Sequence, residues 1–330
     1  MTPEERERRD FIGRATALLA ASGLAGGMAS RDADAAATPQ RVVDRGAPAA
    51  ASGTLRLGGD LEVARMGFGA MRLTGDGIWG EPRDAQACRA VLRRTLELGV
   101  NFIDTADSYG PAVSERLIAE ALHPYPRGLV IATKGGLTRP GPNKWVPDCR
   151  PEHLRAALQG SLKRLKVSQV DLYQLHTADP KVPYEDSLGE VARLQQEGLI
   201  RHVGISNVNV EQLAKARAIL KVVSVQNRYN VTDRGSEAVL QACEQAGIAF
   251  IPWGPLARMG AGAAANPALA ALDAVAKQRG IERSQALLAW LLAKSKVMLP
   301  IPGTSRLEHL EENVAAANVR LDAAEMQRIG

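Results

Sequence analysis

The sequence Asn101-Phe-Ile-Asp-Thr-Ala-Asp-Ser-Tyr-Gly110 joins a short apolar run to a loop that carries polar side chains. The run Val100–Ile103 is typical of a buried parallel strand. Asp104 follows at the carboxyl end of this strand, where parallel sheets present their functional groups, and Tyr109 follows on the loop. A carboxylate and a phenol on one loop can form an acid–base site, but a phenol alone has a pKa near ~10. A nearby cation is therefore needed, and Lys134 ends the next apolar run.

Similar apolar runs repeat along the chain, and helical patterns lie between them. The segment Leu154–Leu165 has leucines at helical spacing, and Pro151 suits the first turn of that helix. A second helix is predicted over Ser187–Glu197, where Gly198 supplies the stop. The predicted strands are Met66–Ala70, Val100–Ile103, Leu129–Thr133, Val170–Leu175, His202–Ile205, Val222–Val225, Ala249–Pro252 and Val297–Pro300.

Strands that alternate with helices in this way favour an α/β fold, a (β/α)8 TIM barrel, with an open doubly wound sheet as the alternative. The run Gly67-Phe-Gly69-Ala-Met-Arg72 lacks the third glycine of the dinucleotide-binding fingerprint, which disfavours a Rossmann site. Thr54–Leu57 and Leu61–Val63 flank Gly58-Gly-Asp60, a pattern that predicts an N-terminal β-hairpin. We expect the barrel with its hairpin to span residues 53–330.

Length and charge set the class of protein. A chain of 330 residues with 45% hydrophobic residues is globular and long enough for one large α/β domain. The net charge is +5, and the positive excess is spread without a Lys/Arg run, which disfavours nucleic-acid binding. Cys88, Cys149 and Cys243 are odd in number and far apart, so they predict neither a disulfide framework nor a zinc motif. No constellation of residues requires a metal.

Residues 1–35 have the charged, apolar and small-residue order of an export signal. A twin-arginine pair, Arg8-Arg9, precedes the Ala/Leu/Gly-rich segment Ala15–Ala29, and Ala33-Asp-Ala35 follows. The segment resembles a twin-arginine (Tat) signal peptide, which implies export of the folded protein by the Tat machinery to the periplasm or cell exterior. The alternative is an N-terminal extension that stays attached to a cytoplasmic protein. Residues 36–52, rich in Ala and Pro, are typical of a linker.

Chemically useful side chains follow six consecutive predicted strands. In a barrel the carboxyl ends of all strands meet at one face. A lone His or Lys at a strand end is more often structural, but the whole series is a much stronger signal. In chain order the series is Asp104 and Tyr109, Lys134, His176, Ser206 and Asn207, Gln226 and Asn227, and Trp253, and the turn Ile301–Arg306 follows the eighth strand.

The first four of these side chains predict a proton-donating site. Lys134 beside Tyr109 favours the phenolate and is expected to lower the pKa of the phenol. Asp104 would keep Lys134 charged and oriented, and His176 can orient a substrate oxygen or relay a proton. This set suits proton donation to a carbonyl oxygen while a hydride arrives at its carbon. Since no side chain supplies hydride, the chemistry requires a nicotinamide cofactor.

The remaining side chains suit such a cofactor. Trp253 offers a flat face for the nicotinamide ring, and the polar residues near it can hydrogen-bond the carboxamide. The turn before the last predicted helix suits a phosphate, because backbone N–H groups and an arginine meet there. The carboxamide partners are Ser206, Asn207 and Gln226, and the phosphate turn is Gly303, Thr304, Ser305 and Arg306.

From about Leu61 to the C-terminus the sequence resembles the aldo-keto reductases, and most resembles the bacterial, pyridoxal reductase-like group. The motifs are Phe102-Ile-Asp-Thr-Ala-Asp-Ser-Tyr-Gly110, Ala132-Thr-Lys-Gly135, Asp171-Leu-Tyr-Gln-Leu-His176, Gly204-Ile-Ser-Asn207, Val225-Gln-Asn227 and Ile301-Pro-Gly-Thr-Ser305 with Glu311-Glu-Asn313. The resemblance implies an NADPH-dependent (β/α)8 barrel that reduces an aldehyde or ketone to an alcohol. It also implies a catalytic tetrad of Asp104, Tyr109, Lys134 and His176.

The resemblance further implies contacts to the cofactor from Gly69, Ala70, Met71, Gly254, Pro255 and Leu256, and from Glu312 and Asn313 on the adenine side. Many members carry basic residues at the positions of Gly303 and His309, so NADH is possible besides NADPH, although Arg306 can compensate. Trp79 and Trp145 lie in loops after the first and third strands. They can form a wall of the substrate site or simply pack the loops onto the barrel.

Two alternatives to a carbonyl reductase stay open at this point. One is a non-catalytic, nucleotide-binding redox sensor or regulatory subunit on the same barrel, which the intact tetrad disfavours. The other is an aldolase that uses Lys134 as a Schiff base, which Asp104 and the nucleotide motifs disfavour. The expected partner is a small-molecule carbonyl substrate, and the oligomeric state is left open.

Overall fold

The computed structural model describes residues 46–256 and 266–330. The predicted signal peptide, residues 1–35, lies outside the described residues. Residues 36–45 of the predicted linker also lie outside them. The chain divides into two units, Met1–Pro39 and Gln40–Gly330, and all of the structure below belongs to the second. Pro48–Ser52, the end of the predicted linker, forms the 3-10 helix η1 with Ala49 fully buried, so ordered structure begins before Gly53.

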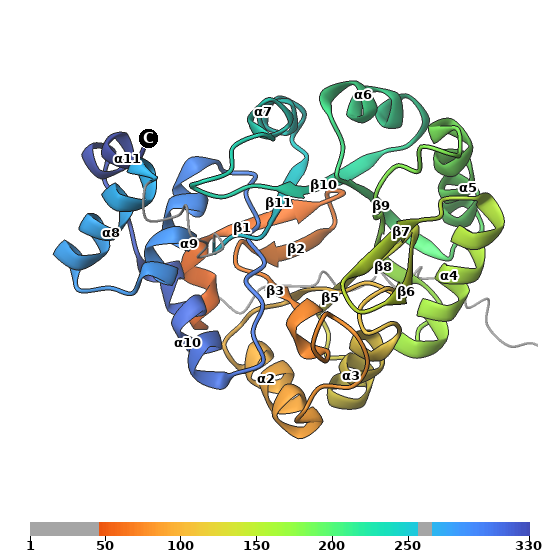
Figure 1. Cartoon of the computed structure of the whole chain (residues 1–330), viewed down its shortest axis with the longest axis horizontal. Coiled ribbons are helices and arrows are strands. Elements are labelled where there is room, and N and C mark those ends of the chain that lie inside the picture. The colour runs from red at the N-terminus through yellow and green to blue at the C-terminus, as the bar shows by residue number, and fades with distance from the viewer. Residues whose placement is uncertain (1–45, 257–265) are drawn as a thin grey trace, which may run out of the picture. The chain divides into compact units, whose positions relative to one another are not determined.

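Seven parallel strands form one curved sheet, which Figure 1 shows with helices around it. Each matches a predicted strand within a few residues, and Val170–Leu175 matches at both ends. In the order in which they pair, the strands are β3 (Phe68–Gly69), β4 (Phe102–Asp104), β5 (Val130–Gly135), β8 (Val170–Leu175), β9 (Ile200–Ser206), β10 (Val222–Arg228) and β11 (Ala249–Trp253).

The eighth predicted strand, Val297–Pro300, closes the barrel without forming a regular strand. Phe250 in β11 donates to the Val297 carbonyl oxygen and accepts from Leu299, both at 2.8 Å. On the other side, the Gly67 N–H before β3 donates to the Pro300 carbonyl oxygen at 2.9 Å. Prolines at positions 300 and 302 lack N–H groups, which prevents a continuous ladder. The segment therefore joins the two sheet edges, and the (β/α)8 prediction is confirmed.

The predicted N-terminal hairpin is also present. β1 (Thr54–Leu57) pairs antiparallel with β2 (Leu61–Ala64). Asn101, just before β4, accepts a hydrogen bond from the Ala64 N–H and donates one to a carbonyl of β2, both at 2.9 Å. Asp60 in the turn lies 2.6 Å from His202 near the start of β9. Because these partners lie at the amino ends of the strands, the hairpin closes the end of the barrel opposite the predicted site.

Helices cover the outside of the sheet (Figure 1). Pro151 begins α4 as predicted, and the helix expected over 187–197 runs from Tyr184 to Gln196, with Gly198 just beyond it at a φ of 79°. A further hairpin, which the sequence did not predict, consists of β6 (Leu137–Gly141) and β7 (Lys144–Pro147). The helices are α2 (Ala85–Glu97), α3 (Val113–Leu122), α4 (Pro151–Leu165), α5 (Tyr184–Gln196), α6 (Val210–Ile219), α7 (Glu237–Ala246), α8 (Pro267–Arg279), α9 (Arg283–Lys294), α10 (Leu307–Ala315) and α11 (Ala323–Ile329), with 3-10 turns η2 (Ala70–Leu73) and η4 (Ala316–Asn318).

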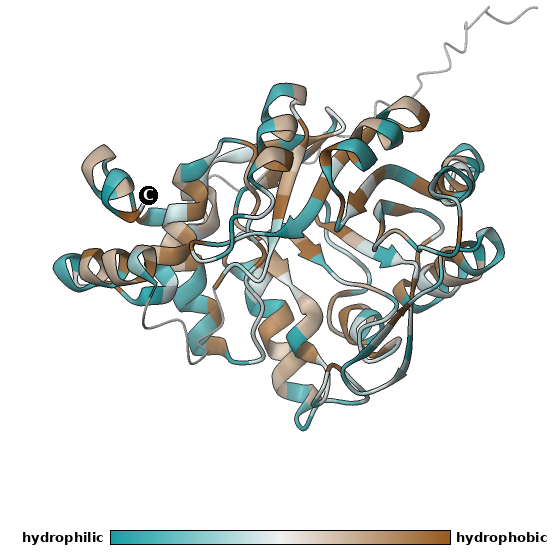
Figure 2. Cartoon of the chain, turned by 45° about the horizontal axis from the view of Figure 1, so that its top comes forward, coloured by the Kyte–Doolittle hydropathy of each residue, from teal (hydrophilic) through white to brown (hydrophobic). Residues whose placement is uncertain are grey.

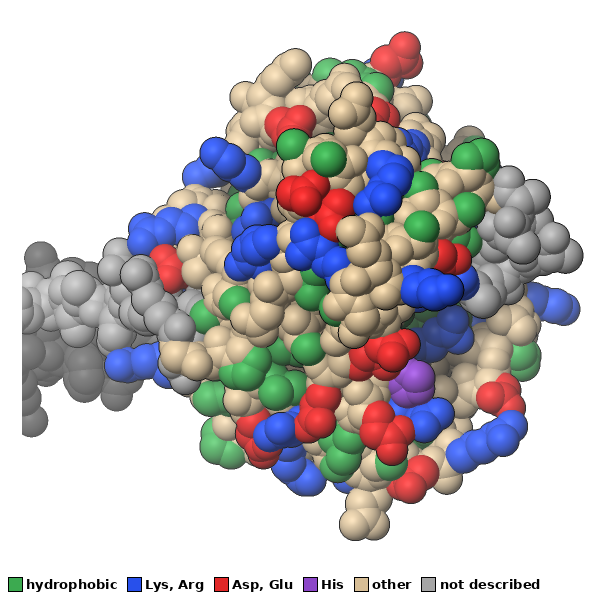
Figure 3. Space-filling view, turned by 90° about the vertical axis from the view of Figure 1, so that its left-hand side faces the viewer, with side chains coloured by type: hydrophobic (Ala, Val, Ile, Leu, Met, Phe, Trp, Pro, Cys, Tyr) green, Lys and Arg blue, Asp and Glu red, His purple; other side chains and the backbone are tan. Residues whose placement is uncertain are grey.

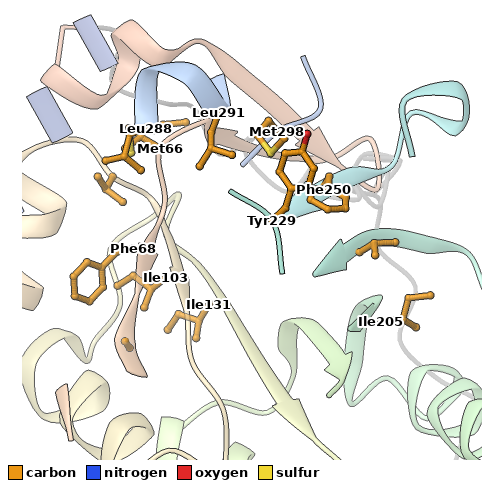
Figure 4. Close-up of a cluster of buried hydrophobic side chains, with 14 of the residues drawn as sticks. Met66, Phe68, Ile103, Ile131, Ile205, Tyr229, Phe250, Leu288, Leu291 and Met298 are labelled. Atoms are coloured by element: carbon orange, nitrogen blue, oxygen red, sulfur yellow. The ribbon is translucent and has the colours of Figure 1, made fainter. Parts of the chain in front are cut away.

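Two apolar clusters fill the barrel and the space between barrel and helices. The inner cluster includes Leu57 and Leu61 from the hairpin together with Phe102, Ala132 and Leu172 from the strands. The outer cluster alternates with it along the strands, as the period of two in a β-strand requires, and Figure 4 shows part of it. In Figure 2 the hydrophobic colour gathers in the central strands, whereas the helices carry both colours.

One face of the molecule carries charged side chains of both signs (Figure 3). Figure 3 shows the side of the molecule that lies on the left in Figure 1, where basic and acidic side chains are interspersed. Within the two described ranges, no helix has both the length and the apolar character that a bilayer span needs.

A buried carboxylate ties α3 and α4 to β5. Glu115 on α3 is fully buried, and its two oxygens accept from Thr133 Oγ1 at 2.5 Å and from Arg164 Nε at 2.6 Å. Arg164 is 27% exposed, so this ion pair is only partly shielded from water. Thr133 precedes Lys134, and the contact therefore supports the strand that carries the predicted site.

We expect Arg164→Met to destabilise the protein by about 3 kcal/mol, because it leaves a buried carboxylate without its counter-ion. The control is Arg83→Met, which removes an exposed partner of Asp76 and should change stability by less than about 1 kcal/mol. Urea unfolding of the three proteins measures both values. Equal, small changes in the two variants would contradict the role given to Arg164.

Candidate active site

Lys134 and Asp104 form a buried ion pair at the carboxyl ends of β5 and β4. Lys134 Nζ lies 2.5 Å from Asp104 Oδ1 and donates to the Thr105 carbonyl oxygen at 2.9 Å. The other carboxylate oxygen accepts from Gln174 Nε2 at 3.0 Å and from Gln226 Nε2 at 2.8 Å. A buried pair of charges is stable only when its remaining atoms are hydrogen-bonded, and these amides meet that requirement.

The register of the strands explains this arrangement. Asp104, Lys134 and Gln174 each come two residues after an inward-facing apolar residue, so they point into the barrel one layer above the apolar cluster. Lys134 and Gln174 are direct partners in the β5–β8 pairing. The fold therefore stacks a polar layer on an apolar one at the carboxyl end of the barrel.

Tyr109 continues the chain of polar groups. Its hydroxyl lies 3.4 Å from Lys134 Nζ. Burial by itself lowers the pKa of Lys134, but Asp104 and Tyr109 outweigh it, so the pKa lies above its ordinary value and the ammonium stays charged. Burial raises the pKa of the Tyr109 phenol, Lys134 opposes this rise, and Asp104 adds to it.

From the sequence we expected Lys134 to lower the pKa of Tyr109, and it does act in that direction. Burial of the phenol outweighs it, so the pKa of Tyr109 lies above its ordinary value. The phenol is therefore protonated at neutral pH, which is the state in which it can donate a proton.

His176 lies beside Tyr109, with ring centroids 6.0 Å apart and planes nearly perpendicular. Its Nδ1 is 3.4 Å from Ser108 Oγ. Burial lowers the pKa of His176 well below its ordinary value, and the charges of Lys134 and Arg139 lower it further. The imidazole is therefore neutral at physiological pH and can hydrogen-bond an oxygen atom.

Asp107, on the same loop as Tyr109, carries a carboxyl oxygen that is buried and has no hydrogen-bond partner among the residues that the structure describes. Burial, together with the nearby Glu115 carboxylate, raises the pKa of Asp107 to about 8. Asp107 is therefore largely protonated at neutral pH, and Asp104 is the carboxylate that balances Lys134.

The residues predicted to contact the cofactor near the barrel seam lie on two adjoining segments. Gly69 ends β3, and Ala70 and Met71 begin η2. A β-carbon on Gly303 would lie 2.3 Å from the Gly69 carbonyl oxygen, so the two backbones approach closely at this point. The segment that leads into η2 therefore lies next to the segment that leads into α10. This is necessary if one nucleotide is to contact both.

A second group of predicted cofactor residues is linked by hydrogen bonds. Ser206 Oγ donates to the Gln226 carbonyl oxygen at 2.7 Å, and Trp253 Nε1 donates to Asn207 Oδ1 at 2.9 Å. Asn207 Nδ2 also donates to the His176 carbonyl oxygen at 2.9 Å. Trp253 is 37% exposed and its ring is held by Asn207, which leaves an aromatic face available for stacking.

The prediction for Gln226 needs refinement. We expected its amide to hydrogen-bond a nicotinamide carboxamide, but its nitrogen donates to Asp104 at 2.8 Å. Its second N–H is directed to Gln174 Oε1 at 3.5 Å, so the oxygen is the atom left for a ligand, and the residue also positions the Asp104 carboxylate. Asn227 does not face the site, since its side chain bonds the Val208 backbone on both sides, at 3.0 and 2.7 Å.

The predicted phosphate turn leads into α10. Thr304 Oγ1 accepts from the Arg306 N–H at 3.0 Å, and Ser305 and Arg306 are exposed. No side chain caps the amino end of α10, so its first N–H groups remain available to an anion. The Arg306 guanidinium lies 2.6 Å from Glu308, with both side chains largely exposed.

The other nucleotide residues lie around this turn and after β11. Glu312 accepts a hydrogen bond from Ser284 Oγ, and Asn313 is buried in α10. Gly254 has a φ of 66° and its carbonyl oxygen accepts from Asn230 at 2.9 Å. Pro255 and Leu256 follow as buried and partly buried residues, and residues 257–265 lie outside the described residues.

The two tryptophans predicted near the substrate differ in their contacts. Trp145, on β7, lies edge-on to Tyr109 and to His176, with centroids 6.2 and 6.3 Å apart. Trp79 forms an isolated bridge with Gly110, next to Tyr109. Trp145 therefore contacts the tetrad directly, whereas Trp79 adjoins its loop.

Sequence reasoning missed three residues of the site: Gln174, Asp107 and Arg139. Gln174 carried a usable signal, because it lies near the end of β8, two positions after the inward-facing Leu172, and so points into the barrel. Arg139 carried none, since it lies on the unpredicted hairpin. The cysteines are free and buried, and the described ranges contain no group of three His, Cys, Asp or Glu that could hold a metal ion.

Comparison with known proteins agrees with this geometry. The model of the aldo/keto reductase family matches residues 65–330. An oxidoreductase of Schizosaccharomyces pombe is 56% identical over 275 residues, which cover 83% of this chain and 88% of that protein. The pyridoxine 4-dehydrogenase of Escherichia coli K12 is 41% identical over 269 residues, which cover 80% of this chain and 92% of that protein.

A solved structure extends the match to the fold. The aldo/keto reductase of Klebsiella pneumoniae in complex with NADP and acetate is 26% identical, covers 84% of this chain and 93% of its own, and has a TM-score of 0.71. Since the family model covers most of the sequence and the relatives cover most of their own length, this chain belongs to the aldo/keto reductase family.

Proposed function

We propose that this protein is an NADPH-dependent carbonyl reductase in which Tyr109 donates the proton. The observation that carries the proposal is the buried series Asp104–Lys134–Tyr109, with contacts of 2.5 and 3.4 Å. The series ends at a protonated phenol, which can act as the proton donor when the carbonyl oxygen becomes an alcohol.

The nicotinamide, when bound, supplies the hydride to the carbonyl carbon. Tyr109 donates its proton to the carbonyl oxygen, and the charge left on the phenolate is balanced by Lys134 at 3.4 Å. Asp104 keeps Lys134 charged in a position from which water is excluded. Neutral His176 is able to hydrogen-bond the same oxygen and fix the orientation of the carbonyl.

The residues present fit a nicotinamide dinucleotide. The Trp253 ring is partly exposed and held by Asn207, the Gly69 and Gly303 backbones come close together, and the amino end of α10 is uncapped. The Trp253 ring suits stacking with the flat nicotinamide ring, and the uncapped end of α10 suits a phosphate. The close approach of the Gly69 and Gly303 backbones brings together the two segments expected to contact the nucleotide. The NADP and acetate in the Klebsiella relative support the same assignment.

We infer that the substrate is a small aldehyde or the matching alcohol. Trp145 borders Tyr109 and His176 with an aromatic edge, which suits an apolar part of such a molecule. The name of the E. coli relative, pyridoxine 4-dehydrogenase, supports a substrate of this size and chemistry. Export by the Tat machinery stays a prediction from the sequence, because residues 1–35 lie outside the described residues.

Tyr109→Phe should lower kcat for an aldehyde by about 10²- to 10⁴-fold, because it removes the proton donor, while nucleotide affinity changes little. Steady-state kinetics and fluorescence titration measure the two effects. Tyr125→Phe is the control, since it removes a phenol that bonds the Leu165 carbonyl oxygen away from the site, and it should leave kcat unchanged. An active Tyr109→Phe enzyme would sink this mechanism.

Lys134→Met should abolish turnover, because the phenolate formed after proton donation loses its counter-ion and the buried Asp104 loses its partner. The control is Lys215→Met, which removes an exposed partner of Glu185 on the surface. Turnover of both variants and thermal unfolding separate loss of catalysis from loss of fold. If a folded Lys134→Met protein kept wild-type turnover, Lys134 would have no part in the chemistry.

NADPH should quench the tryptophan fluorescence by stacking on Trp253 and should bind more tightly than NADH. Trp253→Leu should remove most of the quenching. Arg306→Met should weaken NADPH by about 10-fold and leave NADH unchanged, because it removes a charge-assisted contact to the extra phosphate. Binding of neither nucleotide would contradict the cofactor assignment, and equal binding would show that Gly303 and His309 have relaxed the preference.

A further inference from the structure

Arg139 is a buried cation beside the tetrad that the proposed reaction does not use. It lies on β6, is 8% exposed, and sits 3.6 Å from the centroid of the Trp145 ring. Trp145 in turn lies edge-on to Tyr109 and His176. The same aromatic ring therefore contacts the Arg139 charge and the two groups that we expect to contact a substrate oxygen.

The guanidinium lies near the rings of Trp145 and Trp79, at 3.6 and 5.9 Å, and its hydrogen bonds all go to backbone carbonyl groups. Nε donates to the Lys144 carbonyl oxygen at 2.7 Å, and Nη1 and Nη2 donate to those of Ser108 and Gly77, both at 2.9 Å. Each terminal nitrogen has a second N–H, for which the described part of the chain provides no acceptor. The side chain is thus fixed in place with hydrogen-bonding capacity left over.

Arg139 has no counter-ion among residues 46–256 and 266–330. By contrast, Arg150 and Arg228 both pair with aspartates. A buried charge without a partner is unfavourable, so an anion that binds beside it gains from the interaction.

The balance of charge around the tetrad favours such an anion. Lys134 and Arg139 are cations, Asp104 is the carboxylate that pairs with Lys134, and His176 is neutral. The burial that protonates Asp107 removes the other candidate counter-ion. Of the charged groups around the tetrad, Arg139 is therefore the cation for which the described residues provide no carboxylate.

We propose that Arg139 is a specificity residue that binds an anionic group of the substrate, so that the preferred substrates are small carbonyl compounds carrying a carboxylate or a phosphate. The inference rests on the proposed function, since it concerns the substrate of the same site. A stacked guanidinium suits the role because its planar fork matches the oxygens of both anions and is already held in position.

A purely structural role is the competing interpretation. The three carbonyl contacts join the loops that carry Gly77, Ser108 and Lys144, so Arg139 also ties the loops around the site together. Such a role would affect every substrate equally. A role in specificity would affect anionic substrates selectively.

The test compares pairs of aldehydes that differ in charge. 4-Carboxybenzaldehyde is set against 4-methylbenzaldehyde, and glyceraldehyde 3-phosphate against glyceraldehyde, in the wild type, Arg139→Met and Arg139→Lys. We expect the wild type to prefer at least one anionic member by about 10- to 100-fold in kcat/KM, and the pair that shows it identifies the anion. Arg139→Met should lose this preference and keep the rate with the neutral aldehyde, and Arg139→Lys should keep part of the preference.

A matched control is Arg150→Met, which removes an exposed guanidinium already paired with Asp148, and it should leave the preference intact. Equal kcat/KM values within both pairs for the wild type would overturn the proposal. So would a loss in Arg139→Met that is the same for neutral and anionic aldehydes, since that is the result of a structural role.

Binding separates this proposal from the reductase assignment. The affinities of 4-carboxybenzyl alcohol and 4-methylbenzyl alcohol, measured by tryptophan fluorescence with saturating NADP⁺, need no turnover. If neither aldehyde is reduced, the proposed function fails, and a carboxylate preference in binding that depends on Arg139 still supports the inference. If the neutral aldehyde is reduced but neither binding nor the kcat/KM values of either pair show a preference for the anionic member, the inference alone fails.

Discussion

The buried ion pair between Lys134 and Asp104 is the interaction on which the site depends. Neither side chain reaches water, so each charge is tolerable only because the other lies 2.5 Å away. The pair in turn constrains its neighbours: two glutamine amides must satisfy the second carboxylate oxygen, and β4 and β5 must keep the register that brings the charges together. Tyr109 then meets a cation whose position is already fixed, which is what a proton donor in a dry site requires.

Much of this site could be predicted from the sequence, because apolar runs mark the strands and a barrel brings the carboxyl ends of its strands to one face. Asp104, Lys134 and His176 each follow an apolar run, and a barrel brings the ends of such runs to one face. The closing segment was harder to describe. Val297–Pro300 was expected as a strand, yet the prolines at 300 and 302 leave it with isolated contacts to both sheet edges.

What could not be predicted depends on distances between residues far apart in the sequence. The net rise in the pKa of Tyr109 follows from how completely its loop is buried, which no motif states. The amide nitrogen of Gln226 donates a hydrogen bond to the Asp104 carboxylate, which lies 2.8 Å away across the barrel. Arg139 lies in a hairpin whose strands have no regular hydrophobic pattern, so its position could not be predicted. Its proposed role depends on the lack of an acidic partner within the described ranges, which only the structure shows.

The way in which the barrel closes bears on how the chain can fold as it is made. The first barrel strand, β3, lies beside a segment that comes much later in the sequence. Arg65, just before β3, donates a hydrogen bond to the Met298 carbonyl oxygen, 233 residues later. Until the ribosome has released that distant segment, β3 has an open edge, and closing so long a loop is slow as well as entropically costly. Such an edge can pair with another chain, so a nascent molecule is exposed to aggregation until the segment around Met298 has been made and has closed the barrel.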